Sequence, residues 1–407
     1  MSIKRAKFFM IALAFLFIFF FSSDFGLIDV EKTSIITAFA LDKDGEEYKV
    51  SAQIAVPEAT DTNSENQKAL LAGKGSTIGA AIKDLGDVSG WYPKLSFCNL
   101  IIIGSEFMQE NVITVLDYFA KTLRIQDSAL IAFAEGKASE LLEVASPLDN
   151  ISSFAIQKVL LKTHGFDTDI ANNNIKSFCE GYYSSDSSSY MPIIKKTESS
   201  ENQSQSGGSN GSSSGGSGGS SSSDGQQGQT KTDGKYLFNA KTTALLKNGV
   251  KVGELSEELT LTFNALTKNI TGTTLPIDDV EYNGKTCNYL LKIMSSKKKV
   301  KLCVDNNGPT LNLSLTLYCK INDQNAENSD RNLSENKPLP KNLTDKAEKM
   351  LREQIEELVK TSVETECDFL KVKEKLYRFN QKQYSRFKDN VLSAMETNIS
   401  VTVTGQK

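Results

Sequence analysis

The chain has 407 residues, a length that predicts two or three domains and at least one sizeable core. Hydrophobic residues make up 39% and charged residues 24%, as in an ordinary folded protein that faces water. The net charge of −4 excludes the general basic surface by which proteins hold nucleic acid.

Histidine and cysteine usage excludes most metal and redox sites. His164 is the single histidine, whereas zinc sites, histidine-based triads and facial-triad iron sites need several imidazoles or a cysteine cluster. None of the six cysteines forms a Cys-x-x-Cys pair, which argues against a zinc or thioredoxin-type site. Cys319 continues an alternating run of leucines, so we expect a buried free thiol there. The even number leaves disulfides open for an exported chain. The cysteines are Cys98, Cys179, Cys287, Cys303, Cys319 and Cys367.

A membrane-targeting segment is predicted over residues 1–28. Lys4, Arg5 and Lys7 precede an uninterrupted apolar run of 14 residues, Phe8 to Phe21. At 1.5 Å per residue a helix of this length covers about 21 Å, short of a ~30 Å hydrocarbon core, and suits a signal peptide. No A-x-A cleavage site follows, so the segment could stay attached as a short anchor, and cleavage is the alternative. In both cases the positive-inside rule predicts that the rest of the chain is exported.

An N-terminal α/β domain is predicted over residues 29–148. It opens with a β-hairpin at 35–56, where two apolar, β-rich runs flank a short acidic turn. The turn is too short for a 12-residue calcium loop, which favours a solvated turn. Its acidic residues are Asp42, Asp44, Glu46 and Glu47.

Helices and strands then alternate, which predicts a mixed sheet flanked by helices. A helix over 75–90 has its apolar positions at Ile78, Ala81, Ile82 and Leu85. The remaining predictions are strands at 99–104 and 128–136 and helices at 112–123 and 137–145.

A middle domain is predicted over residues 149–255. Residues 150–182 indicate a helix with an apolar face, and His164 is interpreted as a helix C-terminal residue beside a glycine cap. That face consists of Ile151, Phe154, Ala155, Val159 and Leu160. The domain ends in a strand pair over 235–255 that turns at Asn248-Gly249.

A Gly/Ser-rich tract, residues 197–234, interrupts this domain. Gly and Ser supply 20 of the 30 residues from Glu201 to Thr230. Such a composition buries too little apolar surface to offset its ordering entropy, so we expect a flexible coil of about 30 Å root-mean-square span. It is either an interdomain linker or a loop inserted within a domain.

A C-terminal α/β domain is predicted over residues 256–407. A short helix at 257–266 precedes strands at 288–294, 300–304 and 311–321, with Lys297–Lys299 as a solvated turn between two of them. A long amphipathic helix at 343–366 and a closing strand at 397–405 follow. The apolar side of the long helix comprises Leu343, Ala347, Leu351, Ile355, Leu358 and Val363, and that of the strand Ile399, Val401 and Val403.

A search for catalytic motifs finds no G-x-S-x-G, no Walker loop and no dinucleotide fingerprint. Gly73, Gly75 and Gly79 precede a helix and could bind an anion, but a helix-entry turn is the better interpretation. Carboxylates are plentiful, so a glycosidase pair stays open, although Trp91 is the single tryptophan and sugar clefts usually use several aromatics. We therefore predict no catalytic, cofactor-binding or metal-ligating residue and no cofactor.

Five stretches in succession resemble the Ger(x)C family, the C-type subunits of spore germinant receptors. Together they cover most of the exported chain in the family's order. They are IITAFALDKDGEEYKVSAQIAVP (35–57), GSTIGAAIKDLGDVSGWYPKLSFCNLIIIGSEF (75–107), VLDYFAKTLRIQDSALIAFAEGKASELLE (115–143), LFNAKTTALLKNGVKVGELSEELTLTFN (237–264), and the helix from Leu343 with the strand NISVTVTG (398–405).

The resemblance implies three α/β-type domains and a non-enzymatic, extracytoplasmic subunit in the spore inner membrane. Its implied partners are a multi-pass A-type subunit and a transporter-like B-type subunit. Two departures stand out. Ser22 and Ser23 occupy the place of the family's lipobox cysteine, and residues 384–391 lack a tryptophan often found there.

Three functions follow as hypotheses. The first is a membrane-tethered subunit for nutrient-triggered germination. The alternatives are a cell-envelope hydrolase that uses carboxylates and a generic exported scaffold or adhesion module. Two facing carboxylates in a deep pocket would favour the hydrolase.

Overall fold

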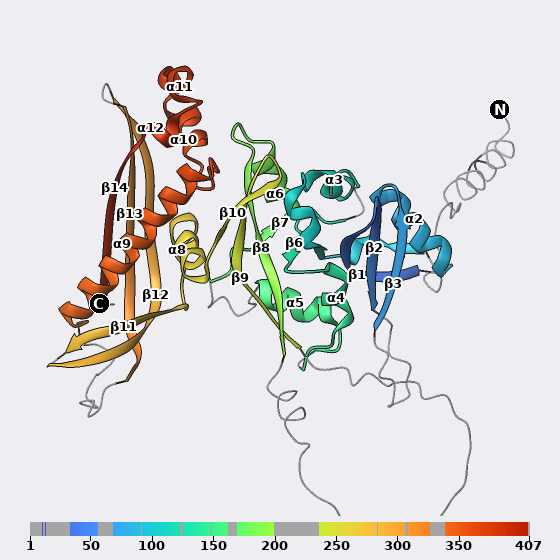
Figure 1. Cartoon of the computed structure of the whole chain (residues 1–407), viewed down its shortest axis with the longest axis horizontal. Coiled ribbons are helices and arrows are strands. Elements are labelled where there is room, and N and C mark those ends of the chain that lie inside the picture. The colour runs from blue at the N-terminus through green and yellow to red at the C-terminus, as the bar shows by residue number, and fades with distance from the viewer. Residues whose placement is uncertain are drawn as a thin grey trace, which may run out of the picture.

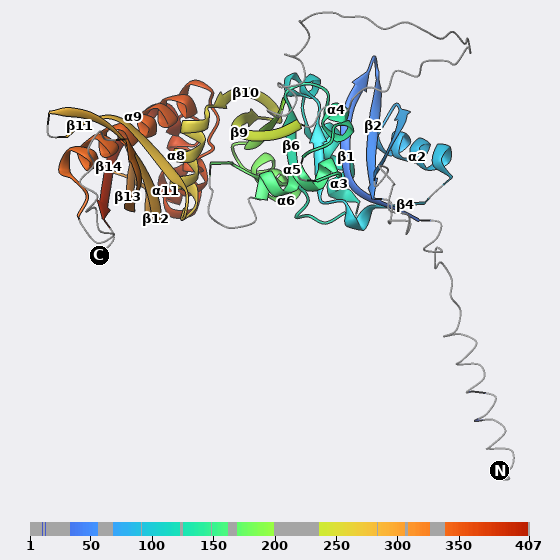
Figure 2. The same cartoon turned by 90° about the horizontal axis from the view of Figure 1, so that it is seen from below.

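The computed structural model describes residues 10, 13, 33–55, 68–90, 92–122, 125–147, 149–161, 169–198, 236–282, 284–305, 308–325 and 338–405. Apart from Met10 and Leu13, the predicted membrane segment lies outside the described residues, as do Trp91 and His164. The described chain forms two units, each built on one sheet, which lie side by side along the long axis in both views (Figures 1 and 2). This confirms the predicted class of mixed sheets flanked by helices.

The N-terminal unit is built on a ten-stranded sheet. Its strands are β1 (Thr33–Asp44), β2 (Glu47–Ala55), β3 (Lys68–Gly75), β4 (Tyr92–Lys94), β5 (Leu100–Ile103), β6 (Leu130–Ala134), β7 (Asn173–Asn174), β8 (Ser188–Glu198), β9 (Tyr236–Lys247) and β10 (Val250–Leu255). The strand order is β10-β9-β8-β6-β5-β1-β2-β3, with β4 beside β1 and β7 beside β6. The neighbours β1, β5, β6 and β8 are parallel to one another.

Helices cover both faces of this sheet. The α-helices are α2 (Ile78–Ser89), α3 (Ile113–Lys121), α4 (Ala138–Glu143), α5 (Ser152–Leu161) and α6 (Ile175–Tyr182), and the 3₁₀ turns are η2 (Leu95–Phe97) and η3 (Ser105–Gln109). α2, α3 and α6 enclose one apolar cluster, and α4 and α5 enclose a second on the opposite face. Every residue of β5 and β6 is therefore buried, as expected of parallel strands between two helical layers.

The first predicted elements are confirmed, with β3 and β4 missed. β1 and β2 form the predicted hairpin, and α2 buries the four predicted residues between an N-cap at Thr77 and a left-handed Gly90. The helix-entry turn expected around Gly73 and Gly75 is wrong, because both lie in β3 and pair with β2. A Cβ on Gly73 would lie 2.2 Å from the Ala81 carbonyl oxygen, so glycine is what allows α2 to approach β3.

The acidic hairpin turn is smaller than predicted. β1 continues through Asp44, which leaves the turn to Gly45 and Glu46. Asp42 is 2% exposed rather than solvated. Its carboxylate accepts hydrogen bonds from the backbone N–H groups of Ala138 (2.6 Å) and Ser139 (2.9 Å), at the start of α4. Asp42 thus supplies acceptors to amides that have no partner within the helix.

The predicted helix over 150–182 is two helices, α5 and α6, with β7 between them. Ala155 and Leu160 are buried as predicted, but Phe154 is 37% exposed and Ile156 takes its place in the core. The prediction of one helix is wrong because the tertiary fold places a strand in the middle of the apolar pattern. Asn174 ends that strand and caps α6 by accepting the Ser177 N–H at 2.9 Å.

The Gly/Ser-rich tract connects two paired strands. Thr197 and Glu198, predicted to belong to the tract, are the last residues of β8, and Glu198 pairs with Tyr236 at the start of β9. The tract is therefore a loop inserted within an antiparallel pair, not an interdomain linker. Its residues 199–234 lie outside the described residues. The hairpin beyond it is confirmed: β9 and β10 turn at Asn248 and Gly249, whose φ angles of 52° and 78° suit a two-residue hairpin turn.

The C-terminal unit is built on a four-stranded sheet. Its strands are β11 (Thr274–Tyr282), β12 (Lys285–Val304), β13 (Pro309–Asn325) and β14 (Glu396–Gly405), in the order β11-β12-β13-β14. Its helices are α8 (Glu257–Thr267), α9 (Lys341–Glu364), α10 (Val372–Phe379), α11 (Gln381–Phe387) and α12 (Val391–Ala394). The predicted short helix, long helix and closing strand are confirmed, and β11 was missed.

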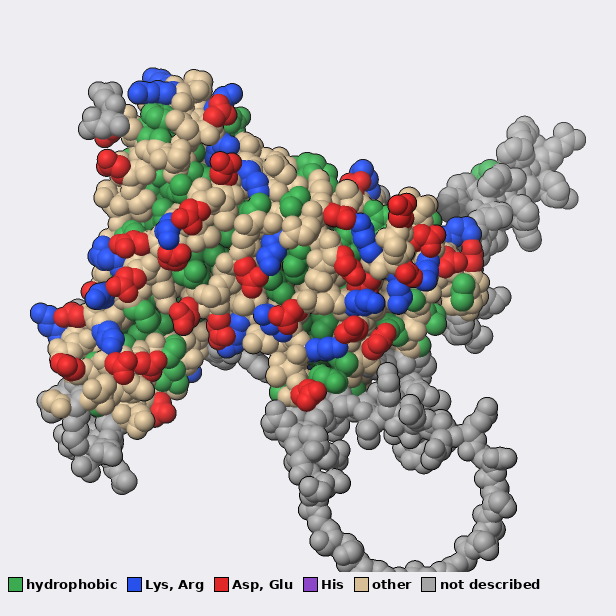
Figure 3. Space-filling model, viewed as in Figure 1, with side chains coloured by type: hydrophobic (Ala, Val, Ile, Leu, Met, Phe, Trp, Pro, Cys, Tyr) green, Lys and Arg blue, Asp and Glu red, His purple; other side chains and the backbone are tan. Residues whose placement is uncertain are grey.

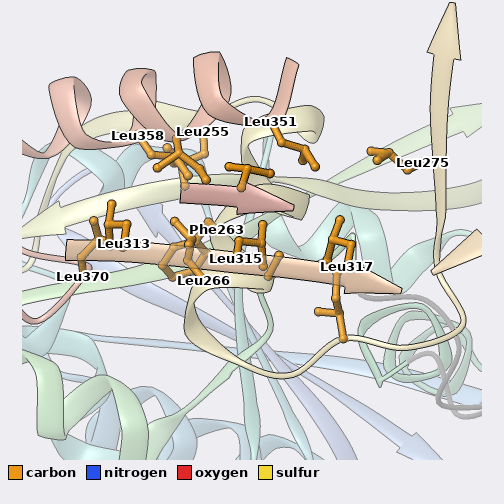
Figure 4. Packing of buried hydrophobic residues seen from close by; sticks show 14 of the residues in the cluster. Leu255, Phe263, Leu266, Leu275, Leu313, Leu315, Leu317, Leu351, Leu358 and Leu370 are labelled. Carbon is orange, nitrogen blue, oxygen red and sulfur yellow. The ribbon is translucent and has the colours of Figure 1, made fainter. Parts of the chain in front are cut away.

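One face of this sheet packs against α8 and α9. β13 alternates between buried leucines and half-buried polar residues along most of its length, the pattern of a strand covered on one side. Figure 4 shows Leu313, Leu315 and Leu317 facing leucines of α9 and Phe263 of α8. Along α9 the predicted positions are buried except Val363, which is half-buried next to a buried Ser362.

The predicted lysine turn is wrong. Lys297, Lys298 and Lys299 lie within β12 and pair with Thr316, Leu315 and Ser314 of β13. β11 pairs only with the first part of β12, through Lys292, so the lysine run forms an edge of the sheet. Charged side chains on an edge strand oppose pairing with another chain. The lysine run therefore lies on the edge of a strand and does not form a turn.

The opposite edge, β14, is covered by α9. Glu348 accepts the Val403 N–H at 2.9 Å, and Arg352 Nη1 donates to the Ile399 carbonyl at 2.7 Å. Two backbone groups that an edge strand would leave open are thereby satisfied.

The division of the chain at residues 148/149 and 255/256 stays a prediction. Strands from 33–148 and 149–255 share one sheet, and the sheets change after β10.

Candidate functional site

A cleft of about 830 Å³ lies between the two units. β8 and α6 form one wall, and the segment around α10 and α11 forms the other (Figure 1). The N-terminal wall is mostly polar, while the C-terminal wall is aromatic and charged. The latter is formed by Asp368, Phe369, Lys371, Glu374, Tyr377, Arg378 and Tyr384.

Asp186 is the centre of a buried joint at the base of this cleft. Its Oδ1 contacts Lys247 Nζ at 2.8 Å and Lys373 Nζ at 3.0 Å, one lysine from each unit. Its Oδ2 accepts hydrogen bonds from the Ser188 hydroxyl and from the Asp368 N–H at 3.1 Å. Burial opposes ionisation of this carboxyl, but the bonds from Lys247, Ser188 and Lys373 outweigh it and hold the Asp186 pKa below its ordinary value.

Asp368 completes the joint from the C-terminal side. Its two carboxylate oxygens accept the N–H groups of Val372 and Lys373, each at 2.7 Å, at the start of α10. Burial raises the pKa of Asp368 to about 6, although those two N–H bonds act in the opposite direction. Glu366 and Lys371 flank it with φ angles of 50° and 57°. The left-handed backbone conformation costs a non-glycine residue roughly 1–2 kcal/mol. The hydrogen bonds of the joint therefore stabilise a tight turn that the backbone by itself would disfavour.

Cys367 borders the joint, and its thiol is buried. Cys367 Sγ donates to the Leu246 carbonyl at 3.4 Å, and its own carbonyl accepts the Ser362 hydroxyl at 2.8 Å. Burial raises the pKa of Cys98, Cys319 and Cys367 to about 12, which keeps these thiols protonated. All six cysteines are free in the structure, so the buried thiol predicted at Cys319 is confirmed.

The two buried carboxylates of the cleft, Asp186 and Asp368, are occupied by structural bonds. Asp186 binds two lysines, a hydroxyl and an amide, and Asp368 binds two amides at a helix start. Within the described ranges, no group of three or more His, Cys, Asp or Glu residues could hold a metal ion. The arrangement is therefore suited to fastening the two units together.

No residue of this joint was predicted from the sequence. Asp186 lies in a serine-rich stretch, SSDSSS, and a single acidic residue in such a stretch does not indicate a buried structural role. Asp368 had a detectable signal, since it stands a few residues before an apolar and basic helical pattern, as helix-capping acids do. Their meeting across 182 positions of sequence depends on the packing of the two units.

A membrane-spanning helix is not found among the described residues, where no helix combines the length and the apolar character that crossing requires. The predicted segment 8–21 lies almost wholly outside that part of the chain.

Two family models and one solved structure are similar to this chain. Residues 27–196 match the family model described as spore germination protein N-terminal domain, and residues 241–405 match that described as spore germination B3/GerAC like, C-terminal. The crystal structure of the GerBC protein is similar at 16% identity and a TM-score of 0.46, covering 92% of this chain and 99% of that one. A search of curated proteins gave no match.

The two family models divide the chain where the Gly/Ser-rich tract stands. The unmatched residues 197–240 contain the whole tract. The five stretches that carried the resemblance fall in the matched ranges, except for residues 237–240 at the start of the fourth stretch. Both units of the structure are matched, in the same order as in the chain. The chain therefore belongs to the GerAC-like family of spore germination proteins.

Proposed function

We propose that the chain is a non-enzymatic subunit of a spore germinant receptor. Its N-terminal segment would hold it on the extracytoplasmic side of the spore inner membrane, where it contacts integral-membrane A-type and B-type subunits. The succession of two spore germination family models over both units is the observation that supports this proposal. Tethering would raise the chain's effective concentration near such partners.

The joint supports a role in binding rather than catalysis. A carboxylate-based hydrolase needs one acid free to donate a proton and one carboxylate free to attack or to activate water. Asp186 and Asp368 instead hold the two units in contact through buried bonds. The chain then presents its two units to partners as a single extended body.

Gene deletion tests the proposal directly. Spores without the gene should lose germination in response to at least one nutrient, and wild-type complementation should restore it. Normal germination of the deleted spores with every nutrient tested would contradict the proposal.

Affinity purification tests the partners and the location. A tagged chain should be found in the spore inner membrane fraction and should co-purify with two multi-pass proteins. Recovery of the chain alone, without a membrane partner, would favour the scaffold alternative.

A variant at the joint separates binding from hydrolysis. Asp368→Asn keeps a side-chain acceptor for the start of α10 but removes the ionisable group. Spores with normal amounts of this variant should still germinate. Complete loss of the response at a normal protein level would favour the hydrolase.

A further inference from the structure

A strongly basic segment runs along α10 and α11. Residues 371–390 contain seven of the chain's 46 Lys and Arg residues but only two of its 50 Asp and Glu residues, in a chain whose net charge is −4. The seven are Lys371, Lys373, Lys375, Arg378, Lys382, Arg386 and Lys388. Such a local excess is unusual for an acidic protein and requires a separate explanation.

Some of these cations have structural partners. Lys373 binds Asp186 in the joint, Lys375 is half-buried and donates to the Leu370 carbonyl at 2.7 Å, and Arg378 pairs with Glu374 at 2.6 Å. Burial lowers the pKa of Lys375, which also sets it apart from a solvent-facing cation. These three do not account for the outward-facing charge.

Lys382, Arg386 and Lys388 are exposed. Within the described part of the chain none of the three forms an ion pair, and Arg386 lies over the ring of Phe387 at 4.8 Å. Figure 3 shows Lys and Arg side chains at the end of the molecule where α11 lies in Figure 1. Their charges are therefore available to a partner outside this chain.

An exposed aromatic side chain, that of Phe379, lies three residues before Lys382 in the same segment. Phe379 is 78% exposed, the highest value among the large hydrophobic side chains described, and its neighbour Tyr377 is 54% exposed. The neighbouring Leu376 and Phe387 are buried and fix the helices to the sheet. Phe379 consequently points away from the core while its surroundings are firmly packed.

We propose that this basic tip, defined as Phe379, Lys382, Arg386 and Lys388, docks onto an anionic lipid surface. Clustered Lys and Arg residues are attracted to lipid phosphates, and an adjacent aromatic ring enters the interfacial layer. Charge complementarity selects a surface of negative phosphates, and the free phenyl ring favours a lipid surface over an acidic protein face. Docking would give the chain a second membrane contact besides its N-terminal segment. The proposal rests on the proposed function only in assuming that a membrane is nearby.

Vesicle partitioning of the full chain tests the proposal. The chain is mixed with vesicles of phosphatidylcholine alone or of phosphatidylcholine with phosphatidylglycerol, and bound protein is measured by flotation at low and high salt. The triple variant Lys382→Gln/Arg386→Gln/Lys388→Gln should lose on the order of 100-fold in partitioning to the anionic vesicles, since each cation contributes roughly fivefold. High salt should reduce this difference.

A matched control removes the same charge elsewhere. Lys83→Gln/Lys121→Gln/Lys349→Gln neutralises three exposed lysines far along the chain from the tip, and it should partition as the wild type does. The N-terminal segment is identical in all variants, so its own binding cancels in the comparison. Equal losses in both triple variants, or no loss in the tip variant, would overturn the proposal.

A tryptophan reporter tests the phenyl ring. Phe379→Trp should show blue-shifted emission and quenching by brominated lipid in anionic vesicles, while Val88→Trp, at an equally exposed position of α2, should not. Equal quenching at both positions would overturn lipid docking. So would lipid-independent capture of the tip by an acidic receptor subunit. Neither result depends on the germination phenotype of the deleted gene, so the two proposals can fail separately.

Discussion

The ten-stranded sheet has helices on both faces, whereas the four-stranded sheet has described helices on one face only. The difference is visible in single strands. β5 is four consecutive buried residues, while β13 alternates buried leucines with Thr310, Asn312, Ser314 and Thr316. A strand between two helical layers thus buries consecutive residues, and a strand with one open face buries every second residue.

The two sheets also protect their edges differently. In the C-terminal unit, the part of β12 that β11 leaves uncovered contains the lysine run, and β14 is covered by α9 through Glu348 and Arg352. In the N-terminal unit, the edge strand β10 lies toward the C-terminal unit, whose core includes Leu255. The joint at Asp186 and Asp368 then fastens the units at that side.

Removing Asp186 should produce the largest effect. Asp186→Ala leaves Lys247 and Lys373 without their counter-charge in a largely buried site, which typically costs 3–5 kcal/mol. We expect chemical denaturation to show a loss of that size and a separation of the two units into distinct transitions. Asp117→Ala removes an exposed ion pair on α3 and should cost about 1 kcal/mol or less. Equal losses for both variants would show that the joint does not hold the units.

Alanine substitutions in neighbouring positions test the contrast between the sheets. Ile101→Ala and Ile102→Ala in β5 remove side chains from opposite apolar clusters and should each cost about 2–5 kcal/mol. In β13, Leu315→Ala should cost as much, but Thr316→Ala should change the free energy of unfolding by less than about 0.5 kcal/mol. Denaturant midpoints provide the measurement. A large loss at Thr316 would mean that the open face is covered.

The pH dependence of stability tests the raised pKa of Asp368. The folded-state pKa of Asp368 is about 6 against an ordinary 3.8, so between these values the folded chain keeps a proton that the unfolded chain has released. This group's contribution to the free energy of unfolding therefore falls as the pH rises through that window. Asp368→Asn removes the contribution, so wild type should lose stability relative to this variant from pH 4 to 6 and then level off. A constant difference would contradict the assigned pKa.

The pKa shift of Asp186 is opposite in sign to that of Asp368. Its folded-state pKa is lowered, so its contribution is fully present above the ordinary carboxyl pKa and is lost as the pH falls through the lower folded-state value. The two acids of one joint thus respond to different pH ranges. Parallel titration of the stability of Asp186→Asn and Asp368→Asn would separate them.

Local pattern predicted many of the elements. The hairpin at β1 and β2, the buried face of α2 and the apolar side of α9 follow from periodicity and turn residues within a few positions. The errors occur where distant neighbours decide. The lysine run became a strand because β13 offers it a hydrogen-bonding partner, and the apolar stretch after residue 150 was divided because β7 pairs with β6.

The sequence by itself determined the family, the α/β class and most of the helices. These depend on short-range periodicity and on motifs in a fixed order. Only the tertiary structure decided that β8 and β9 pair across the Gly/Ser-rich tract and that Asp186 meets Asp368. Such contacts join residues far apart in the chain, and their free energy arises from burial and pairing after the sheets have formed. The tertiary structure also left Phe379 exposed, although helix periodicity places it on the same side as the buried Leu376 three residues earlier.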